Sequence, residues 1–139
     1  SKIEHETKDI GLVYNEARTL YTGVETFAKE IKQGPNPGST YELLAELDDM
    51  FRALGRSQHI INTTHDVVME YWNTRMQPTL TKIENDVNTG KRITYDWKSW
   101  CQNLKQELER KKATIIQELP KLNKLYTSLQ EIDAKMKTP

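Results

Sequence analysis

Hydrophobic residues recur every three or four positions along most of this chain, which is the period of an amphipathic α-helix. In the first stretch, two apolar sets fill the two seam positions of a heptad: Ile3, Ile10, Ala17, Val24 and Ile31, and then Val13, Leu20 and Phe27. Such a seam keeps one face of a helix against a partner helix. The pattern predicts a first helix over residues 3–33.

The second helix is predicted over residues 40–88, after a breaker from Gln33 to Gly38 that contains two prolines. Ser39 and Glu42 have the spacing of a capping box. The apolar stripe comprises Leu44, Leu47, Phe51, Leu54, Ile61, Val68 and Trp72, with polar Gln58 and His65 in the same seam. Pro78 should kink this helix, because its ring clashes with the preceding turn.

The third helix is predicted over residues 94–137, with Gly90 at the end of the preceding helix and Thr94 as N-cap. Its seams contain Cys101, Leu108, Ile115, Leu122, Leu129 and Met136, and then Trp97, Leu104, Leu125 and Ile132, while Lys111 and Glu118 interrupt them. Pro120 should bend this helix.

Short connections make consecutive helices antiparallel neighbours. The sequence therefore predicts one all-α domain over residues 1–139, an elongated antiparallel three-helix bundle or coiled coil. Folding back at the breakers puts Ile3 near Met69 and Met136 near Leu44. The first helix would then cover only Leu43–Met69 and Ile115–Met136, which leaves a protruding two-helix hairpin from about Glu70 to Arg110.

Large aromatic residues concentrate in that expected hairpin: Tyr71, Trp72, Tyr95, Trp97 and Trp100. Two helices alone cannot bury three indoles well, and exposed aromatic groups are typical of interfaces. These five residues are therefore predicted to bind a partner protein or a second copy of the chain. The alternative is that Trp97 and Trp100 close the end of the intramolecular core.

Composition excludes several classes of function. The 139 residues carry 20 basic and 20 acidic side chains, so the basic excess typical of nucleic-acid binders is absent, and no nucleic-acid partner is expected. The single cysteine favours an intracellular, cytoplasmic location. No apolar run approaches the ~20 residues that span a bilayer.

Catalytic and metal sites are not indicated. His59 and His65 lie on different helix faces, and the Glu-x-x-His motif of di-iron bundles is absent. Cys101 lies on a seam and is interpreted as a structural thiol. We expect no enzyme activity, no metal and no cofactor.

The densest basic stretch comprises Lys105, Arg110, Lys111 and Lys112, with Lys121 and Lys124 nearby. It could contact anionic lipid or an acidic partner, although neighbouring glutamates could equally make it a solvated face. A membrane-associated helical dimer that senses curvature is therefore the alternative function.

Three helices with heptad seams and Trp residues resemble a spectrin-type repeat in architecture. The second helix is longer than one repeat allows, and no family motif can be placed. The leading hypothesis is a helical scaffold or adaptor domain that binds proteins by helix packing. By fold-level analogy, such rods serve cytoskeletal, kinetochore and autophagy assemblies.

Overall fold

The computed structural model describes residues 2–34, 41–90 and 97–137; within these ranges the side chains of residues 2–4, 87 and 97–98 are not described. The helices are α1 (Lys2–Gln33), α2 (Tyr41–Tyr71), the π-helical turn η1 (Trp72–Met76), α3 (Gln77–Asn88), α4 (Trp97–Ile116) and α5 (Glu118–Lys137). Of the described residues, only Gly34, Thr89, Gly90 and Gln117 lie outside a helix. The prediction of an all-α chain is confirmed.

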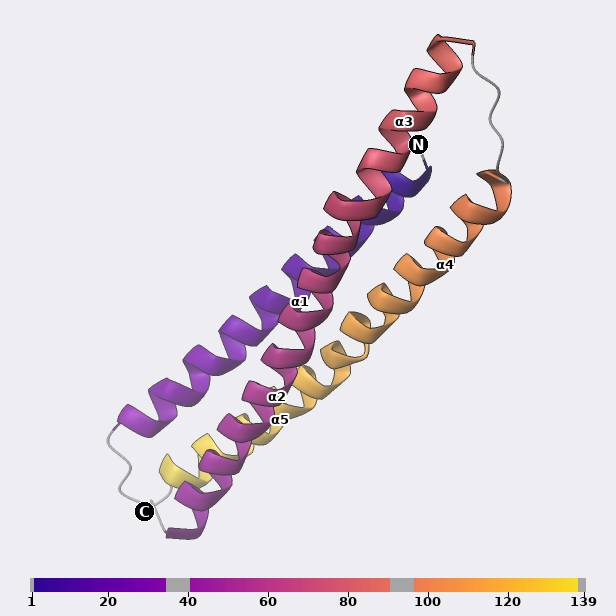
Figure 1. Cartoon of the computed structure of the whole chain (residues 1–139). Helices are drawn as coiled ribbons and strands as arrows, with labels where there is room; N and C mark the ends of the chain where they lie inside the picture. Colours follow the sequence, from indigo (N-terminus) through magenta and orange to yellow (C-terminus); the bar gives the residue numbers. More distant parts are fainter. Residues whose placement is uncertain (1, 35–40, 91–96, 138–139) are drawn as a thin grey trace.

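The helices form three rods, as Figure 1 shows. The first rod is α1, the second runs through α2, η1 and α3, and the third runs through α4 and α5. α1 packs against α2, α4 and α5, and α2 packs against α4 and α5. Each rod therefore shares its apolar face with the other two.

The heptad seams form the core. The buried side chains, each at most 4% exposed, include Ile10, Ala17, Val24 and Ile31 from α1, Leu47, Leu54, Ile61 and Val68 from α2, and Leu108, Ile115, Leu122, Leu129 and Met136 from the third rod. Within each group, consecutive residues are seven positions apart. Burial of these stripes supplies the main driving force for packing the rods.

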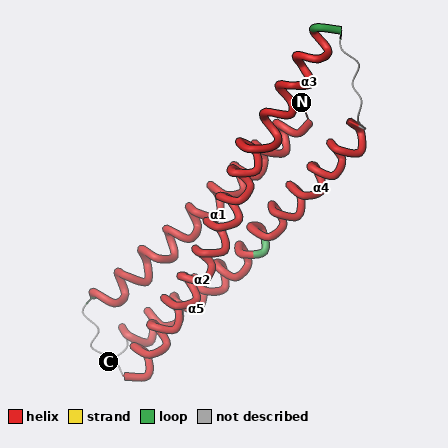
Figure 2. The backbone as a smooth tube through the Cα atoms, viewed as in Figure 1, coloured by secondary structure: helices red, strands yellow, loops and turns green. Residues whose placement is uncertain are grey.

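The third rod is interrupted once, at Gln117 (Figure 2). Pro120 explains the position, because a proline ring clashes with the carbonyl four residues earlier, which here belongs to Ile116. α4 ends at that residue, and the amide of Gln117 donates to the carbonyl of Ala113 at 3.0 Å. The two helices continue in nearly the same direction, so the rod remains extended.

The second rod ends at Asn88, and Gly90 follows with φ +72°. This left-handed conformation is the one that favours glycine after a helix, as the sequence predicts. The expected caps at Ser39 and Thr94 lie outside the described residues.

The overlap of the rods differs from the sequence prediction. α1 was expected to cover the third rod only from Ile115 onward, but it also packs against α4. The rings of Phe27 and Tyr126 lie 5.5 Å apart. This contact places α1 beside the third rod at a position closer to α4 than the sequence predicted. Leu104 and Leu108 are consequently buried, so the expected two-helix section from Glu70 to Arg110 is too long. A seam that repeats every seven residues packs similarly in registers one heptad apart, and the sequence could not choose between them.

Candidate functional site

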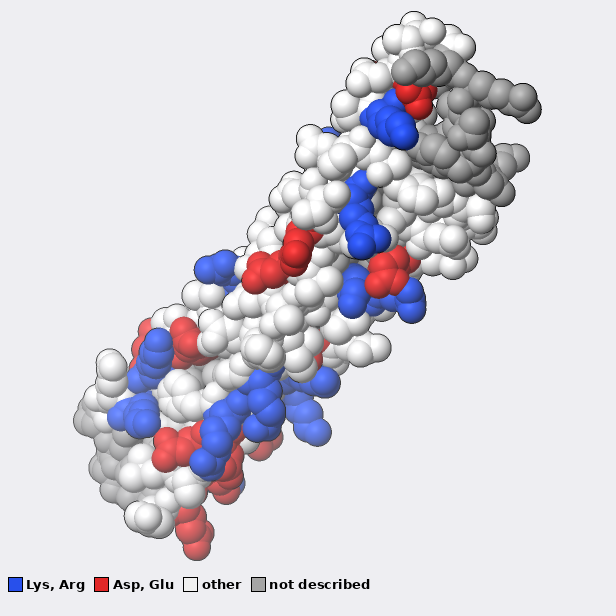
Figure 3. Space-filling model, in the orientation of Figure 1, with Lys and Arg blue, Asp and Glu red and all other residues white. Residues whose placement is uncertain are grey.

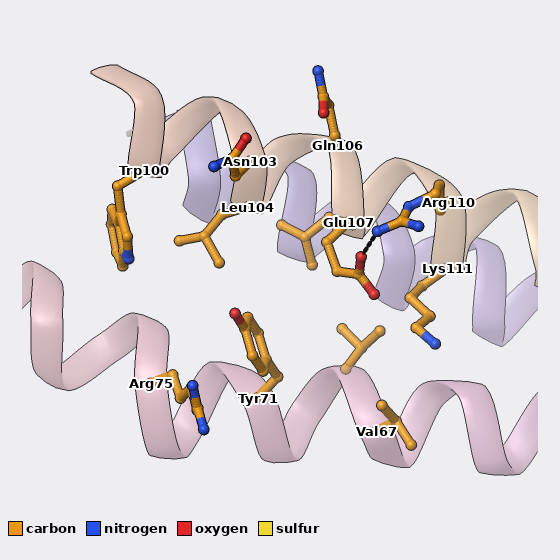
Figure 4. Close-up of a pocket in the computed structure, with 12 residues that line it drawn as sticks. Val67, Tyr71, Arg75, Trp100, Asn103, Leu104, Gln106, Glu107, Arg110 and Lys111 are labelled. Carbon is orange, nitrogen blue, oxygen red and sulfur yellow. Dashed lines mark hydrogen bonds and ion pairs between the residues drawn. The ribbon is translucent and has the colours of Figure 1, made fainter. Parts of the chain in front are cut away.

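A hollow of about 680 Å³ lies on the surface between the second and third rods. We call it the aromatic hollow. Its lining residues come from α2, η1 and α4 and none comes from α1: Val67, Val68, Tyr71, Arg75, Trp100, Asn103, Leu104, Gln106, Glu107, Leu108, Arg110 and Lys111. In Figure 4, Tyr71 from α2 and Trp100 from α4 both point into the space between the two helices.

The π-helical turn before Pro78 sets the position of one wall. The amide of Gln77 donates to the carbonyl of Trp72, five residues earlier, so the turn holds one residue more than an α-helical turn. The buried heptad of α2 runs through Leu47, Leu54, Ile61 and Val68, and would next reach Arg75.

The structure places Met76 in the core instead, with 0% of its surface exposed, and leaves Arg75 exposed. The extra residue therefore moves Arg75 out of the core and onto the hollow. Its guanidinium lies over the ring of Tyr71, 5.9 Å from the centroid, where a cation and an aromatic face attract each other.

The five aromatic residues predicted to bind a partner have different positions. Tyr71 and Trp100 line the aromatic hollow. Trp72 does not line it, and all three are partly buried and pack against the core. Trp97 is the first residue of α4, but its side chain is not among those that the structure describes. Tyr95 lies outside the described residues. The structure thus brings two of the five together, and their partial burial comes from contacts within this chain.

The four basic residues predicted to contact lipid or an acidic partner also occupy different positions. Arg110 and Lys111 line the aromatic hollow, whereas Lys105 and Lys112 do not. Arg110 is ion-paired with Glu107, as Figure 4 shows, and Lys105 lies 3.9 Å from Glu109. The described residues include no acidic partner for Lys111, which leaves its charge available at the edge of the hollow.

Polar side chains inside the bundle form two clusters, and the sequence did not predict which residues would contact each other in them. The imidazole of His65 stacks on the ring of Tyr14 at 3.8 Å, and the Tyr14 hydroxyl donates to Oδ1 of Asn62 at 3.2 Å. Ser57 Oγ donates to the carboxylate of Glu118 at 3.3 Å. The Glu118 side chain is 2% exposed and also accepts from Lys121 Nζ at 3.3 Å.

Of the polar seam residues that the sequence singled out, His65 and Glu118 therefore pack against other rods. Gln58 is exposed and lines a small hollow between α1 and α2. The seam spacing identified the positions, but their partners depend on the register between the rods.

The surroundings of Tyr21, Glu25 and Cys101 shift the pKa values of these side chains. Burial and a hydrogen bond to Glu25 raise the pKa of Tyr21 to about 12, and the same hydrogen bond lowers the pKa of Glu25. Burial raises the pKa of the Cys101 thiol, which disfavours the reactive thiolate. These shifts follow from burial and from the hydrogen bond between Tyr21 and Glu25.

Within the part of the chain that the structure describes, no three His, Cys, Asp or Glu side chains converge to hold a metal ion. None of the described helices contains an apolar stretch long enough to cross a membrane. No protein-family model, no curated protein and no solved structure matches this chain.

Proposed function

We propose that this chain is a non-enzymatic helical scaffold or adaptor domain. In this proposal it is an elongated antiparallel three-helix bundle with coiled-coil seams, and it binds another protein in the aromatic hollow. The observation that carries the proposal is that Tyr71 and Trp100 point into one hollow, whose lining combines apolar side chains with polar and charged ones. Protein interfaces commonly have this anatomy, with aromatic anchors at the centre and polar groups around them.

The chemistry of the hollow supports binding of protein side chains. Val67 is 44% exposed on the wall of the hollow, so an apolar group entering there would cover surface that now faces water. Tyr71 and Trp100 present large ring surfaces that are already held by contacts with the core. Anchors that are ordered before binding lose little conformational entropy when a partner arrives.

An anionic membrane surface is the alternative that the basic residues allow. Two observations support a protein partner over it. The exposed side chain of Val67 lies in a concave hollow, while insertion into lipid uses a convex apolar face. Two of the four predicted lipid contacts, Lys105 and Arg110, already have glutamate partners on their own helix.

Site-specific photo-crosslinking tests the proposal. A benzoylphenylalanine is placed at Val67 in the aromatic hollow, and the matched control carries it at Leu12, which is 67% exposed on α1. We expect a discrete protein adduct from Val67 that Leu12 does not give. The adduct protein is then purified, and we expect Tyr71→Ser to weaken its binding by about tenfold or more, as for a hot-spot residue. Identical adducts from both positions, or binding that Tyr71→Ser leaves unchanged, would contradict the proposal.

A further inference from the structure

A second hollow lies between the same two rods, nearer the C-terminal end of the chain. It encloses about 520 Å³ between α2 and α5. Its apolar lining includes Met50, Ile60 and Leu125, and its charged lining comprises Arg56, Lys121, Lys124 and Glu118. Because α2 packs against both α4 and α5, this hollow and the aromatic hollow lie on the same pair of rods.

The two hollows share one face of each rod. On α2, Ala53 and Ile60 of the second hollow are followed at seven-residue spacing by Val67 of the aromatic hollow. On the third rod, Lys111, Glu118 and Leu125 are seven apart and pass from one hollow to the other. Residues seven apart lie on the same face of a helix, so the hollows form one line. We call this line the long groove.

Charge is distributed unevenly among the grooves of this net-neutral chain. The long groove is lined by six cations, Arg56, Arg75, Arg110, Lys111, Lys121 and Lys124, against two acids, Glu107 and Glu118. The hollow between α1 and α2 has one of each sign, Arg18 and Glu25. The hollow between α1 and α5 is lined by Glu16 and no cation. In Figure 3, Lys and Arg side chains recur along the length of the face shown, with Asp and Glu side chains beside several of them.

Both acids of the long groove are already neutralised within the chain. Glu107 pairs with Arg110, and the buried Glu118 accepts from Lys121. Arg56, Arg75, Lys111 and Lys124 have no acidic partner among the described residues. Four cations therefore line a groove whose apolar lining includes Val67, Ile60 and Leu125, which is complementary to a partner with an apolar stripe and acidic flanks.

We infer that the long groove binds an acidic amphipathic helix of a partner protein, which would pack as a fourth helix beside α2 and the third rod. This inference rests on the proposed function and names the chemistry of the partner. From Met50 to Arg75 the groove spans about 37 Å at 1.5 Å per residue, so a helix of ~25 residues would cover it. Its apolar stripe would contact Val67, Tyr71 and Ile60, and its flanking acids would meet the four cations.

The test uses two designed peptides of 25 residues, because no natural partner is needed. Both carry the same leucine stripe at helical spacing; one has glutamate on both flanks and the other has lysine. Binding of the labelled peptides to the whole chain is measured by fluorescence anisotropy at about 0.15 M salt, where the Debye length is about 8 Å. We expect the acidic peptide to bind at least about tenfold more tightly than the basic one, since rim charges select the partner.

Charge reversal locates the interaction. We expect the double variant Arg75→Glu/Lys111→Glu to weaken binding of the acidic peptide by about tenfold or more. The matched control, Lys8→Glu/Lys29→Glu, makes the same change of charge on exposed residues of α1 and should change binding less than about twofold, because more distant surface charges are screened by salt. Circular dichroism confirms that each variant is helical.

Several outcomes would overturn the inference. Equal binding of both peptides, or equal effects of both double variants, would show that the groove cations do not select the ligand. Concentration-dependent dimerisation lost in Arg75→Glu/Lys111→Glu would assign the groove to a second copy, and binding to phosphatidylserine vesicles lost in that variant would assign it to a membrane. If a protein cross-linked at Val67 binds normally while the acidic peptide does not, the inference fails and the proposed function stands.

Discussion

Replacing Met76 with alanine tests the shift of register that places one wall of the aromatic hollow. Met76 has 0% of its surface exposed in the core, whereas Arg75 beside it is exposed. An uninterrupted heptad would have put residue 75 in the core, following Val68 by seven positions. The π-helical turn instead places residue 76 in the core and residue 75 on the surface.

The magnitude follows from the burial. Truncation of a fully buried methionine to alanine costs about 2–5 kcal/mol, so we expect Met76→Ala to lower the free energy of unfolding by about 3 kcal/mol. Arg75→Ala removes an exposed group and its contact with the Tyr71 ring, and should cost less than about 1 kcal/mol. In a domain of this size, 3 kcal/mol corresponds to a decrease of about 10 °C in Tm.

Urea denaturation followed by circular dichroism measures both variants against the unaltered chain. The wild-type slope with denaturant should be retained, which shows that the change is one of stability. If Arg75→Ala costs as much as Met76→Ala, the heptad continues through residue 75. The account of how Arg75 reaches the hollow would then be wrong.

Two further predictions concern polar groups in the bundle. The pKa of Tyr21, raised to about 12 by burial and by Glu25, should appear in an ultraviolet pH titration as a transition near pH 12 that Tyr21→Phe removes and Glu25→Gln moves to lower pH. Because the folded pKa is above the unfolded value of 10.0, this group stabilises the fold below pH 10.0 and the contribution is lost as the pH rises through about 12; a titration curve that Tyr21→Phe leaves unchanged near pH 12 would contradict this. Tyr14→Phe removes the hydrogen bond to Asn62 and should cost about 1 kcal/mol in urea denaturation, while Tyr41→Phe, at a residue that is 89% exposed, should cost almost nothing. Equal costs would remove the structural role of that hydrogen bond.

The seams were predictable because each rests on local periodicity. Ile10, Ala17, Val24 and Ile31 could be assigned to a buried face from their spacing alone, and all four are buried. The helix end before Gly90 was equally predictable, because glycine adopts the left-handed backbone conformation after a helix without steric strain. These features depend on residues close together in the chain.

The site was less predictable because it depends on distances between rods. The sequence grouped Tyr71 with Trp100 as partner-binding aromatics and Arg110 with Lys111 in a basic stretch, but only the register of α2 against α4 brings the two pairs to one hollow. A signal for Arg75 was present in the sequence: the heptad of α2 reaches a charged residue just before Pro78, and the adjacent Met76 offers an apolar replacement. The overlap of α1 with the third rod was also predicted incorrectly, because several registers between the rods bury the same apolar stripes.

The central claim, that a partner protein occupies the aromatic hollow, is tested most directly by methyl NMR. The spectrum of the whole chain is recorded with and without the protein recovered by crosslinking from Val67. We predict that the methyl resonances of Val67 and Leu104, which line the hollow, shift on binding, while those of Leu12, exposed on α1, do not. Shifts at Leu12 with no change at Val67 or Leu104 would contradict it.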